Sequence, residues 1–378
     1  MHKMHHLYNI SVHLNHSSRF ASTPYELILT GFLGFSIIAT VLLNGLIIAV
    51  YLQNPLLRNS FKTYIVNLSI AEVLLALTGM TGNFISAVFG YWPLPDAVCT
   101  FVLYGSRIFG SGIRYGHVII TLNRLWAVMY PLHYKRHHTL MVANASIVVS
   151  WVLAHAVHLP VIIPGRMWLL EGEERCVLNV GFQKRAAIAV EVMGFTAAEG
   201  VIICLCPVVW YKVRQWRINQ ERQQKQMPLN AARPQEISKS KDDNESIIDQ
   251  DSRMTANGPT DTLVSLSPKR SAPAGNHMIL TTTAIRKPSP DDMAKLRLTF
   301  SKRSVAHNRL LMYFFVAILL CWTPNNVYWL LVDTAGYWNG TFNIIQAVAL
   351  YAHSWINPII SYIALEKIRV SINKLMGC

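Results

Sequence analysis

The feature that most constrains this chain is a series of seven long apolar segments. Each contains the roughly 20 mostly apolar residues that an α-helix needs to cross a bilayer. We predict transmembrane helices at residues 26–51, 61–88, 98–130, 141–163, 186–212, 306–332 and 342–363. Only 14% of the 378 residues are charged, against about 25% in soluble proteins. The sequence therefore predicts an all-α membrane protein, a seven-transmembrane helix bundle.

The apolar segments form two blocks, residues 26–212 and residues 306–363, with polar regions around them. Residues 1–25 form a polar tail. Residues 213–305 are rich in Lys, Arg, Gln, Ser, Asp and Pro and almost free of aromatic residues, which predicts a disordered loop. Residues 364–378 form a short tail after the last span.

This last tail has an amphipathic pattern. Ile368, Ile372 and Leu375 recur at helical spacing with cations between them, so a short amphipathic helix on the membrane surface is expected. Cys378 follows, and it either carries a lipid or remains an unmodified thiol.

The positive charges predict the orientation of the helices. Lys135 and Arg136 lie on the same side as the long basic loop and the C-terminal tail, whereas cations on the other side are partly offset by Glu171, Glu173 and Glu174. The positive-inside rule then places the N-terminus outside the cell and the C-terminus in the cytoplasm. We expect a multi-pass protein of the plasma membrane. Since the basic residues lie between apolar spans, the net charge of +14 does not predict nucleic-acid binding.

Two features of the outer side follow from this orientation. Asn9, Asn15 and Asn339 lie in sequons that would be accessible to glycosylation. Cys99 and Cys176 are the only cysteines predicted on this oxidising side, so we expect a disulfide between them.

Motifs on these segments resemble those of the rhodopsin-like (class A) G-protein-coupled receptors. They are Asn44 in LLNG, Glu72 in NLSIAE, Arg124 in NRL, Trp151, Trp322 and Pro324 in CWTP, and Asn357 and Pro358 in NPII. Each motif alone is a weak signal, but their order and spacing together are specific. The resemblance implies a cell-surface receptor that binds an extracellular ligand in the bundle and activates heterotrimeric G proteins, without a cofactor.

The same resemblance implies an activation switch. Its members are Asn44, Glu72, Arg114, Arg124, Trp322, Pro324, Asn357 and Pro358. Arg124 corresponds to the arginine that meets the G-protein helix in the active state; the alternative is an interfacial arginine that reaches towards the headgroups. Trp322 is the expected movable residue, because Pro324 leaves a carbonyl unpaired and lets the helix hinge.

The chain departs from the family pattern beside Arg124. Asn123 and Leu125 replace the usual acidic residue and tyrosine, so the restraining ion pair with the neighbouring residue is absent. Melatonin-type receptors also carry Asn before this arginine. Low basal activity is therefore in doubt, but coupling is not excluded.

Further departures lie deeper in the bundle. Glu72 replaces an aspartate, Ile113 replaces a small polar residue and His353 replaces an asparagine, so we expect no tightly bound sodium ion. Ser361 occupies the position of the NPxxY tyrosine. The adjacent Tyr362 points about 100° away and cannot substitute for it.

By resemblance, the ligand pocket is predicted at Ser106, Arg107, Gly110, Glu191, Trp322, Asn325, Asn326, Trp329 and Tyr351. This aromatic set with amides and a cation suits a small molecule or a peptide terminus. Ser106 replaces the aspartate of amine receptors and Tyr351 the lysine of opsins, so neither a biogenic amine nor retinal is expected. Asn325 and Asn326 could instead form hydrogen bonds between helices.

The buried charges suggest ion pairs. Arg107 and Arg114 are seven residues apart and share one helix face. Arg107 should lie level with Glu191, and Arg114 should pair with Glu199 or Glu72, because an unpaired charge at this depth is costly. Arg107 is either part of a structural ion pair or an anchor for an anionic ligand group, held by Glu191 until the ligand arrives.

Three alternatives belong to other functional classes. A transporter or channel could use the intramembrane Arg and Glu residues, although the spans show no internal repeat. A membrane hydrolase with a metal site would need paired ligands, yet His117, His155, His158 and His353 form no HxxxH pair. We therefore predict neither an enzyme nor a metal site. A seven-helix receptor without G-protein signalling remains the third alternative.

Overall fold

The computed structural model describes residues 24–167, 176, 184–231, 290–335, 337 and 339–377. The chain forms two units, one of residues 1–220 with 298–378 and one of residues 221–297. The predicted sites at Asn9, Asn15 and Cys378 lie outside the described residues, as does most of the long loop.

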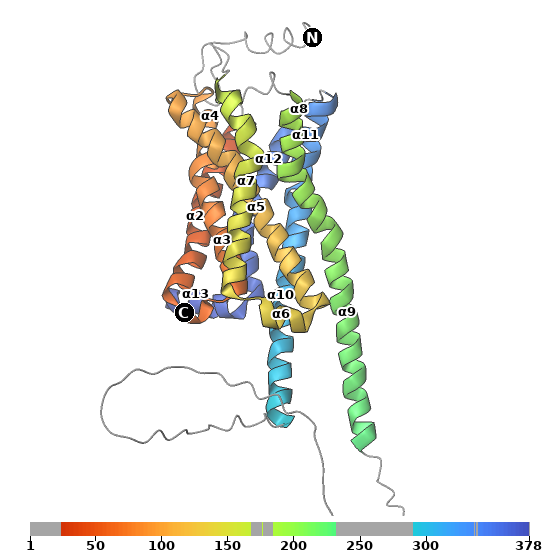
Figure 1. The fold of residues 1–378 in the computed structure, drawn as a ribbon. Coiled ribbons are helices and arrows are strands. Elements are labelled where there is room, and N and C mark those ends of the chain that lie inside the picture. The colour runs from red at the N-terminus through yellow and green to blue at the C-terminus, as the bar shows by residue number, and fades with distance from the viewer. Residues whose placement is uncertain are drawn as a thin grey trace, which may run out of the picture. The chain divides into compact units, whose positions relative to one another are not determined.

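Helices account for nearly all of the described chain (Figure 1). In chain order they are α2 (Pro24–Gln53), η1 (Pro55–Leu57), α3 (Ser60–Leu75), η2 (Ala76–Met80), α4 (Thr81–Phe89), α5 (Asp96–Met129), α6 (Pro131–His137), α7 (Leu140–Met167), α8 (Lys184–Glu191), η3 (Val192–Thr196), α9 (Ala197–Ala231), α10 (Pro290–Cys321), α11 (Thr323–Ala335), α12 (Gly340–Ala364) and α13 (Glu366–Met376). The π-helical turns η2 and η3 interrupt the second and fifth predicted spans. A break at Trp322 separates α10 from α11 within the sixth.

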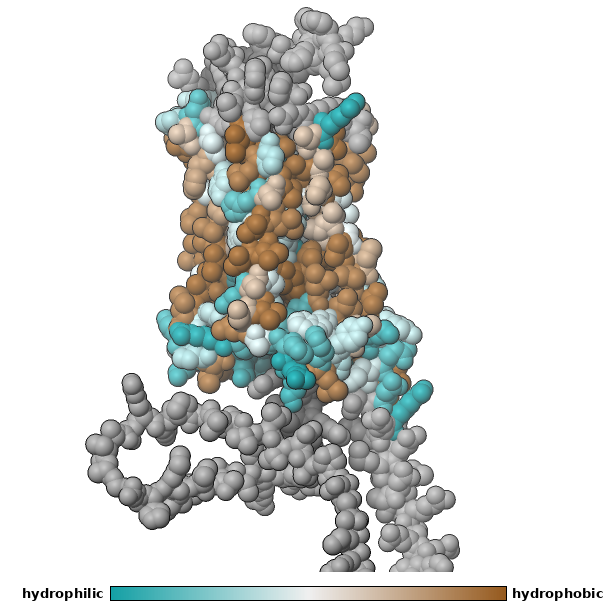
Figure 2. Space-filling view, viewed as in Figure 1, coloured by the Kyte–Doolittle hydropathy of each residue, from teal (hydrophilic) through white to brown (hydrophobic). Residues whose placement is uncertain are grey.

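Most spans are apolar enough to lie against lipid. By length and composition, five described helical segments could cross a membrane, or six when α12 is counted with α13, which bends away by 102°. Apolar side chains cover the middle of the face in Figure 2, and polar ones gather towards its ends. The predicted all-α membrane bundle is confirmed.

Helix α5 fails this apolar test, and its arginines give the reason. Arg107, Arg114 and Arg124 reduce its hydropathy, but α5 packs against α3, α7 and η3 inside the bundle. Its side chains from Gly105 to Arg124 are mostly buried. A span enclosed by other helices can carry charges that a lipid-facing helix could not.

Close packing around α5 depends on a missing side chain. A Cβ atom on Gly112 would lie 2.9 Å from the ring of Trp151 on α7, closer than real Cβ contacts. The Trp151 indole N–H in turn donates to Asn67 Oδ1 on α3 at 3.0 Å. Gly112 therefore allows one tryptophan to join three helices.

Two predicted boundaries are wrong. Residues 213–231 and 290–305, predicted as parts of a disordered loop, belong to α9 and α10. They contain many Arg, Gln, Lys and Glu residues, which are good helix formers despite their polarity. Lys135 and Arg136, which lie between the third and fourth predicted spans, belong to the short helix α6.

The ends of the bundle follow the predictions more closely. The amphipathic helix is confirmed as α13, which buries Ile368 and Ile372 and lies at the same end as α6 (Figure 1). Tyr362 donates to Asn373 Oδ1 of α13 at 2.9 Å. Its hydroxyl therefore joins the end of α12 to α13.

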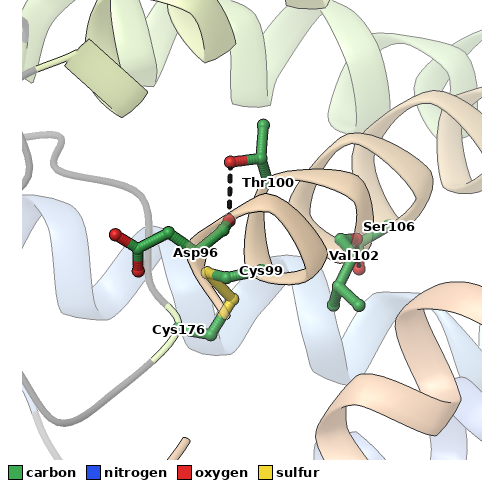
Figure 3. Close-up of a disulfide and its surroundings, with 6 residues drawn as sticks. All are labelled: Asp96, Cys99, Thr100, Val102, Ser106 and Cys176. Carbon is green, nitrogen blue, oxygen red and sulfur yellow. Dashed lines mark hydrogen bonds between the residues drawn. A yellow bond between two sulfur atoms is a disulfide. The ribbon is translucent and has the colours of Figure 1, made fainter. Parts of the chain in front are cut away.

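A disulfide closes the opposite end (Figure 3). Cys99 in the first turn of α5 is bonded to Cys176, with Cα atoms 5.5 Å apart, which confirms the predicted pair. The bond closes a loop with a sequence separation of 77. In the chain-entropy view, closing a loop of this size stabilises the fold by about 4 kcal/mol.

Candidate functional site

The outermost arginine of α5 forms the predicted ion pair. Arg107 Nη1 lies 2.6 Å from Glu191 Oε2 at the end of α8. The two side chains are 35% and 24% exposed, so water still reaches the pair. The prediction that Arg107 lies level with Glu191 is confirmed.

The prediction for Arg114 is wrong. Within the described chain it forms no ion pair with Glu199, Glu72 or any other carboxylate. Its guanidinium is buried between the rings of Phe195 and Trp322, at 4.4 Å and 4.8 Å from their centroids. Its one hydrogen bond, from Nη1 to the Gly110 carbonyl, is long at 3.3 Å, and Nε has no acceptor. Aromatic faces thus replace the expected carboxylate.

Glu199, one of the two carboxylates predicted to pair with Arg114, instead accepts hydrogen bonds from neutral donors. Thr323 Oγ1 donates to Glu199 Oε1 at 2.6 Å, and the Asn326 amide donates to the other oxygen. Both donors lie on α11, just beyond the break at Trp322. Glu199 therefore joins α9 to α11 and is not directed at α5.

The turn η3 also changes the expected geometry. An unbroken α-helix would rotate Glu199 by about 80° from Glu191. A π turn accommodates one additional residue, so the rotation is closer to that of seven α-helical residues, about −20°. The same turn places Phe195 beside Arg114.

The second predicted partner, Glu72, is part of a buried cluster. Asn357 Nδ2 donates to Glu72 Oε1 at 2.7 Å, and His353 Nδ1 lies 3.5 Å from the same oxygen. The rings of His117 and His353 lie 5.3 Å and 4.6 Å from that of Trp322. The cluster connects Trp322 with the part of α12 that contains Pro358. Asn44 Nδ2 adds a bond from α2 to the Ser354 carbonyl at 3.0 Å.

Arg124 at the inner end of α5 has only neutral acceptors. Its Nη2 donates to Asn123 Oδ1 at 2.5 Å and to the Tyr134 hydroxyl at 2.7 Å. Its Nη1 lies 3.1 Å from His307 Nδ1 of α10, and its guanidinium lies 4.2 Å from the ring centroid of Phe61. No carboxylate contacts it in the described structure, so the expected absence of an ion pair with residue 123 extends to its other neighbours.

His138, which the sequence did not single out, completes this inner cluster. Asn123 Nδ2 lies 2.7 Å from His138 Nε2, and the His138 ring stacks on Tyr134 at 4.5 Å. Burial and then the charge of Arg124 lower the pKa of His138 to about 4. His138 is therefore neutral at physiological pH and accepts from Asn123.

Most of the other predicted pocket residues form hydrogen bonds with different neighbours. Ser106 donates to the Val102 carbonyl at 2.8 Å, and both residues are labelled in Figure 3. Asn325 donates to Gln346 at 2.5 Å, and Tyr351 accepts from Asn83. Trp329 is 37% exposed. Asn325 and Asn326 thus both join helices, as in the alternative interpretation.

Three of the predicted residues are connected through one side chain that the sequence did not reveal. The Phe195 ring lies against the guanidinium groups of Arg107 and Arg114, and Arg114 in turn contacts Trp322. Phe195 is one of many apolar residues in its span, and nothing in its local sequence distinguishes it. Its position depends on η3, which sequence periodicity did not predict.

Comparisons with known proteins identify a receptor family. A family model described as 7 transmembrane receptor (rhodopsin family) matches residues 43–361. The chain is 28% identical over 132 residues to the D(1B) dopamine receptor of Mus musculus, which is 35% of this chain and 27% of that receptor. It is 27% identical over 135 residues to the 5-hydroxytryptamine receptor 2 of Aplysia californica, which is 35% of this chain and 32% of that receptor. The match thus spans about a third or less of each relative.

Proposed function

Because the chain belongs to the rhodopsin family of seven-transmembrane receptors, we propose that it binds an extracellular ligand and activates heterotrimeric G proteins. It is a multi-pass membrane receptor and not an enzyme. The proposal places it in the plasma membrane with its N-terminus outside. Its ligand would bind around Arg107, Glu191 and Trp322, and the G protein would bind at the end that contains Arg124.

The observation that carries this proposal is the neutral environment of Arg124. A buried guanidinium on α5 is linked to α10 by one hydrogen bond to His307. A hydrogen bond made by a charged group contributes about 1.5–3 kcal/mol, less than the 3–5 kcal/mol lost when a buried ion pair is broken. A small outward shift of α10 would therefore release Arg124 Nη1 for a G-protein helix, while Nη2 stays bonded to Asn123 and Tyr134.

A cavity between α9 and α10 supports the same site. It has a volume of about 470 Å³ and is lined by α9 residues from Val209 to Arg217 and α10 residues from Val305 to Met312. Its apolar walls include Val209, Val213 and Leu311, and Arg214, Arg217 and Arg309 add positive charge. Such a lining suits an amphipathic helix with acidic groups.

The proposed ligand is not a biogenic amine, as the sequence predicts. The two relatives are named as a dopamine and a 5-hydroxytryptamine receptor, and their similarity does not support this exclusion. The argument comes from side chains: Ser106 provides no carboxylate on α5, and Glu191 is already bonded to Arg107. Retinal is excluded in this proposal because Tyr351 cannot form a Schiff base.

Second-messenger measurements test the proposal. We would express the full chain in cells and record cyclic AMP, inositol phosphate and calcium, without ligand and with a ligand library, at matched surface expression. We expect at least one messenger to change, and Arg124→Gln to remove the change. Arg369→Gln, a matched loss of an exposed cation on α13, should keep it. Equal signals from native and Arg124→Gln receptors would reject the proposal, as would a surface-expressed receptor that changes none of the three.

A further inference from the structure

Arg114 is a buried cation whose hydrogen-bonding capacity is largely unused. A guanidinium has five N–H donors, and the described structure provides Arg114 with one carbonyl at 3.3 Å. By contrast, Arg124 has three acceptors between 2.5 Å and 3.1 Å. Arg114 is thus ready to accept an anionic partner that the chain itself does not supply.

The nearest carboxylates are committed to other groups. Glu191 is bonded to Arg107, Glu199 to Thr323 and Asn326, and Glu72 to Asn357. Moving Glu72 to Arg114 would leave the buried Asn357 donor unpaired, and moving Glu191 or Glu199 would break the part-buried contacts that they already make. An external anion has no such penalty.

A small space lies beside the guanidinium. A Cβ atom on Gly110 would lie 3.5 Å from Phe195 and 3.9 Å from Arg114 Nη1, which are ordinary van der Waals distances. The glycine therefore leaves a space of about methyl size next to the charge. Phe195 and Trp322 form apolar walls around it.

We infer that the ligand carries a carboxylate on an apolar body and that Arg114 binds this carboxylate. The inference rests on the proposed receptor function. The planar guanidinium fork matches a carboxylate through two parallel hydrogen bonds, and the ring walls suit an aliphatic or aromatic body. An ammonium ligand would meet two like charges instead, since Arg107 and Arg114 lie about 10 Å apart along α5.

Carboxylate binding at this point would also reach the hinge. Trp322 covers the guanidinium and lies at the break between α10 and α11. An anion that pairs with Arg114 would compete with this ring for the cation. Displacement of the Trp322 ring then transmits binding to α10, which carries His307 at its inner end.

Matched acids and amines test the inference. The purified full-length receptor is unfolded thermally with phenylacetate, indole-3-acetate or octanoate, and with phenethylamine, tryptamine or octylamine as the amine counterparts. We expect at least one acid to raise Tm by several degrees at millimolar concentration, with no rise from its amine, because a ligand that binds only the folded state stabilises it. No rise with any acid, or an equal rise with its amine, overturns the inference.

Two variants locate the site. Arg114→Gln should abolish the acid-dependent rise, and Gly110→Val should abolish it while keeping the charge, because its side chain fills the space. If Arg114→Gln does not fold, Gly110→Val decides, and Arg369→Gln serves as the unaffected control. A rise that survives in either site variant overturns the inference. Loss of the inference alone would leave the Arg124-dependent signalling intact, so the two failures are distinguishable.

Discussion

Arg107 and Arg124 lie near opposite ends of the same helix and are held in opposite ways. Arg107 is partly exposed and has a carboxylate at 2.6 Å. Arg124 is buried and has only neutral acceptors. The ion pair of Arg107 therefore lies where water screens it. The neutral acceptors surround Arg124, where burial would make an ion pair with a carboxylate strongest.

This difference indicates that the inner end of the bundle is restrained less strongly than the outer end. Two formal charges and a disulfide hold the outer end of α5, whereas hydrogen bonds to Asn123, Tyr134 and His307 hold the inner end. A buried ion pair would restrain α10 strongly, whereas the hydrogen bond from Arg124 to the neutral His307 ring restrains it less. We therefore expect measurable signalling without ligand.

The largest expected effect concerns the covalent bond of the outer end. Cys99→Ala and Cys176→Ala should each reduce surface expression severalfold, because the loop then loses its attachment to α5. The double mutant should be no worse than either single one. Flow cytometry of tagged receptors measures this, with the exposed free cysteine Cys204→Ala as control. Additive damage would mean that the two cysteines stabilise the fold separately.

A carboxylate placed opposite Arg124 should give the inner end of α5 an ion pair like that of Arg107 at the outer end. His307→Glu should lower ligand-independent signalling severalfold, because it replaces a neutral acceptor 3.1 Å from the guanidinium by an anion. His307→Gln keeps a neutral acceptor and should signal like the native receptor. Second-messenger accumulation at equal surface expression gives the comparison. Unchanged signalling in His307→Glu would mean that α10 is not restrained through Arg124.

The sequence predicted the outer end better than the middle of the bundle. The disulfide followed from topology, and the pairing of Arg107 with Glu191 followed from helix rise, because both depend on position along a helix. Apolar length predicted seven spans, and five or six described segments are apolar enough to cross a membrane; α5, with three arginines, is not among them.

The contacts of Arg114 could not be predicted in the same way. They depend on a π turn that shifts the face of the fifth span, and on competition for Glu199 by Thr323 and Asn326. Sequence periodicity assumes an unbroken helix. The spacing of residues along one helix also cannot show which donor on a neighbouring helix will bond to Glu199. The helical ends of the long loop were missed because polarity reports exposure and not backbone conformation.

A smaller effect should follow from the outer ion pair itself. Arg107→Gln and Glu191→Gln should each destabilise the receptor by about 1 kcal/mol, since the pair is partly exposed. A loss of this size lowers Tm by about 2–4 °C in domains of 150–250 residues, so we expect a decrease of about 2 °C or less in this longer chain. The swap Arg107→Glu with Glu191→Arg should recover part of the loss. If Glu191→Gln instead keeps its Tm and responds more strongly to ligand, Arg107 is a ligand anchor held in reserve.

The smallest effect is a pH dependence at the inner end. The pKa of His138 is about 4 in the folded chain and about 6.5 when unfolded. The unfolded state binds the proton more readily, so the stability from His138 is complete above about pH 6.5. It decreases as pH falls towards 4. Because the ring is partly exposed, we expect a loss of about 1 kcal/mol between pH 7.5 and 5.

The measurement is the Tm of purified receptor at pH 7.5 and 5, compared with that of His138→Gln. Other groups also titrate in this range, so the informative quantity is the difference between the two proteins. His138→Gln should lose less Tm on acidification, and His137→Gln, which changes an exposed histidine of α6, should behave like the native chain. The same acidification should raise ligand-independent signalling in permeabilised cells, because a protonated His138 no longer accepts from Asn123 and places a second positive charge near Arg124. Equal Tm losses in native and His138→Gln receptors would show that this histidine does not stabilise the inner end.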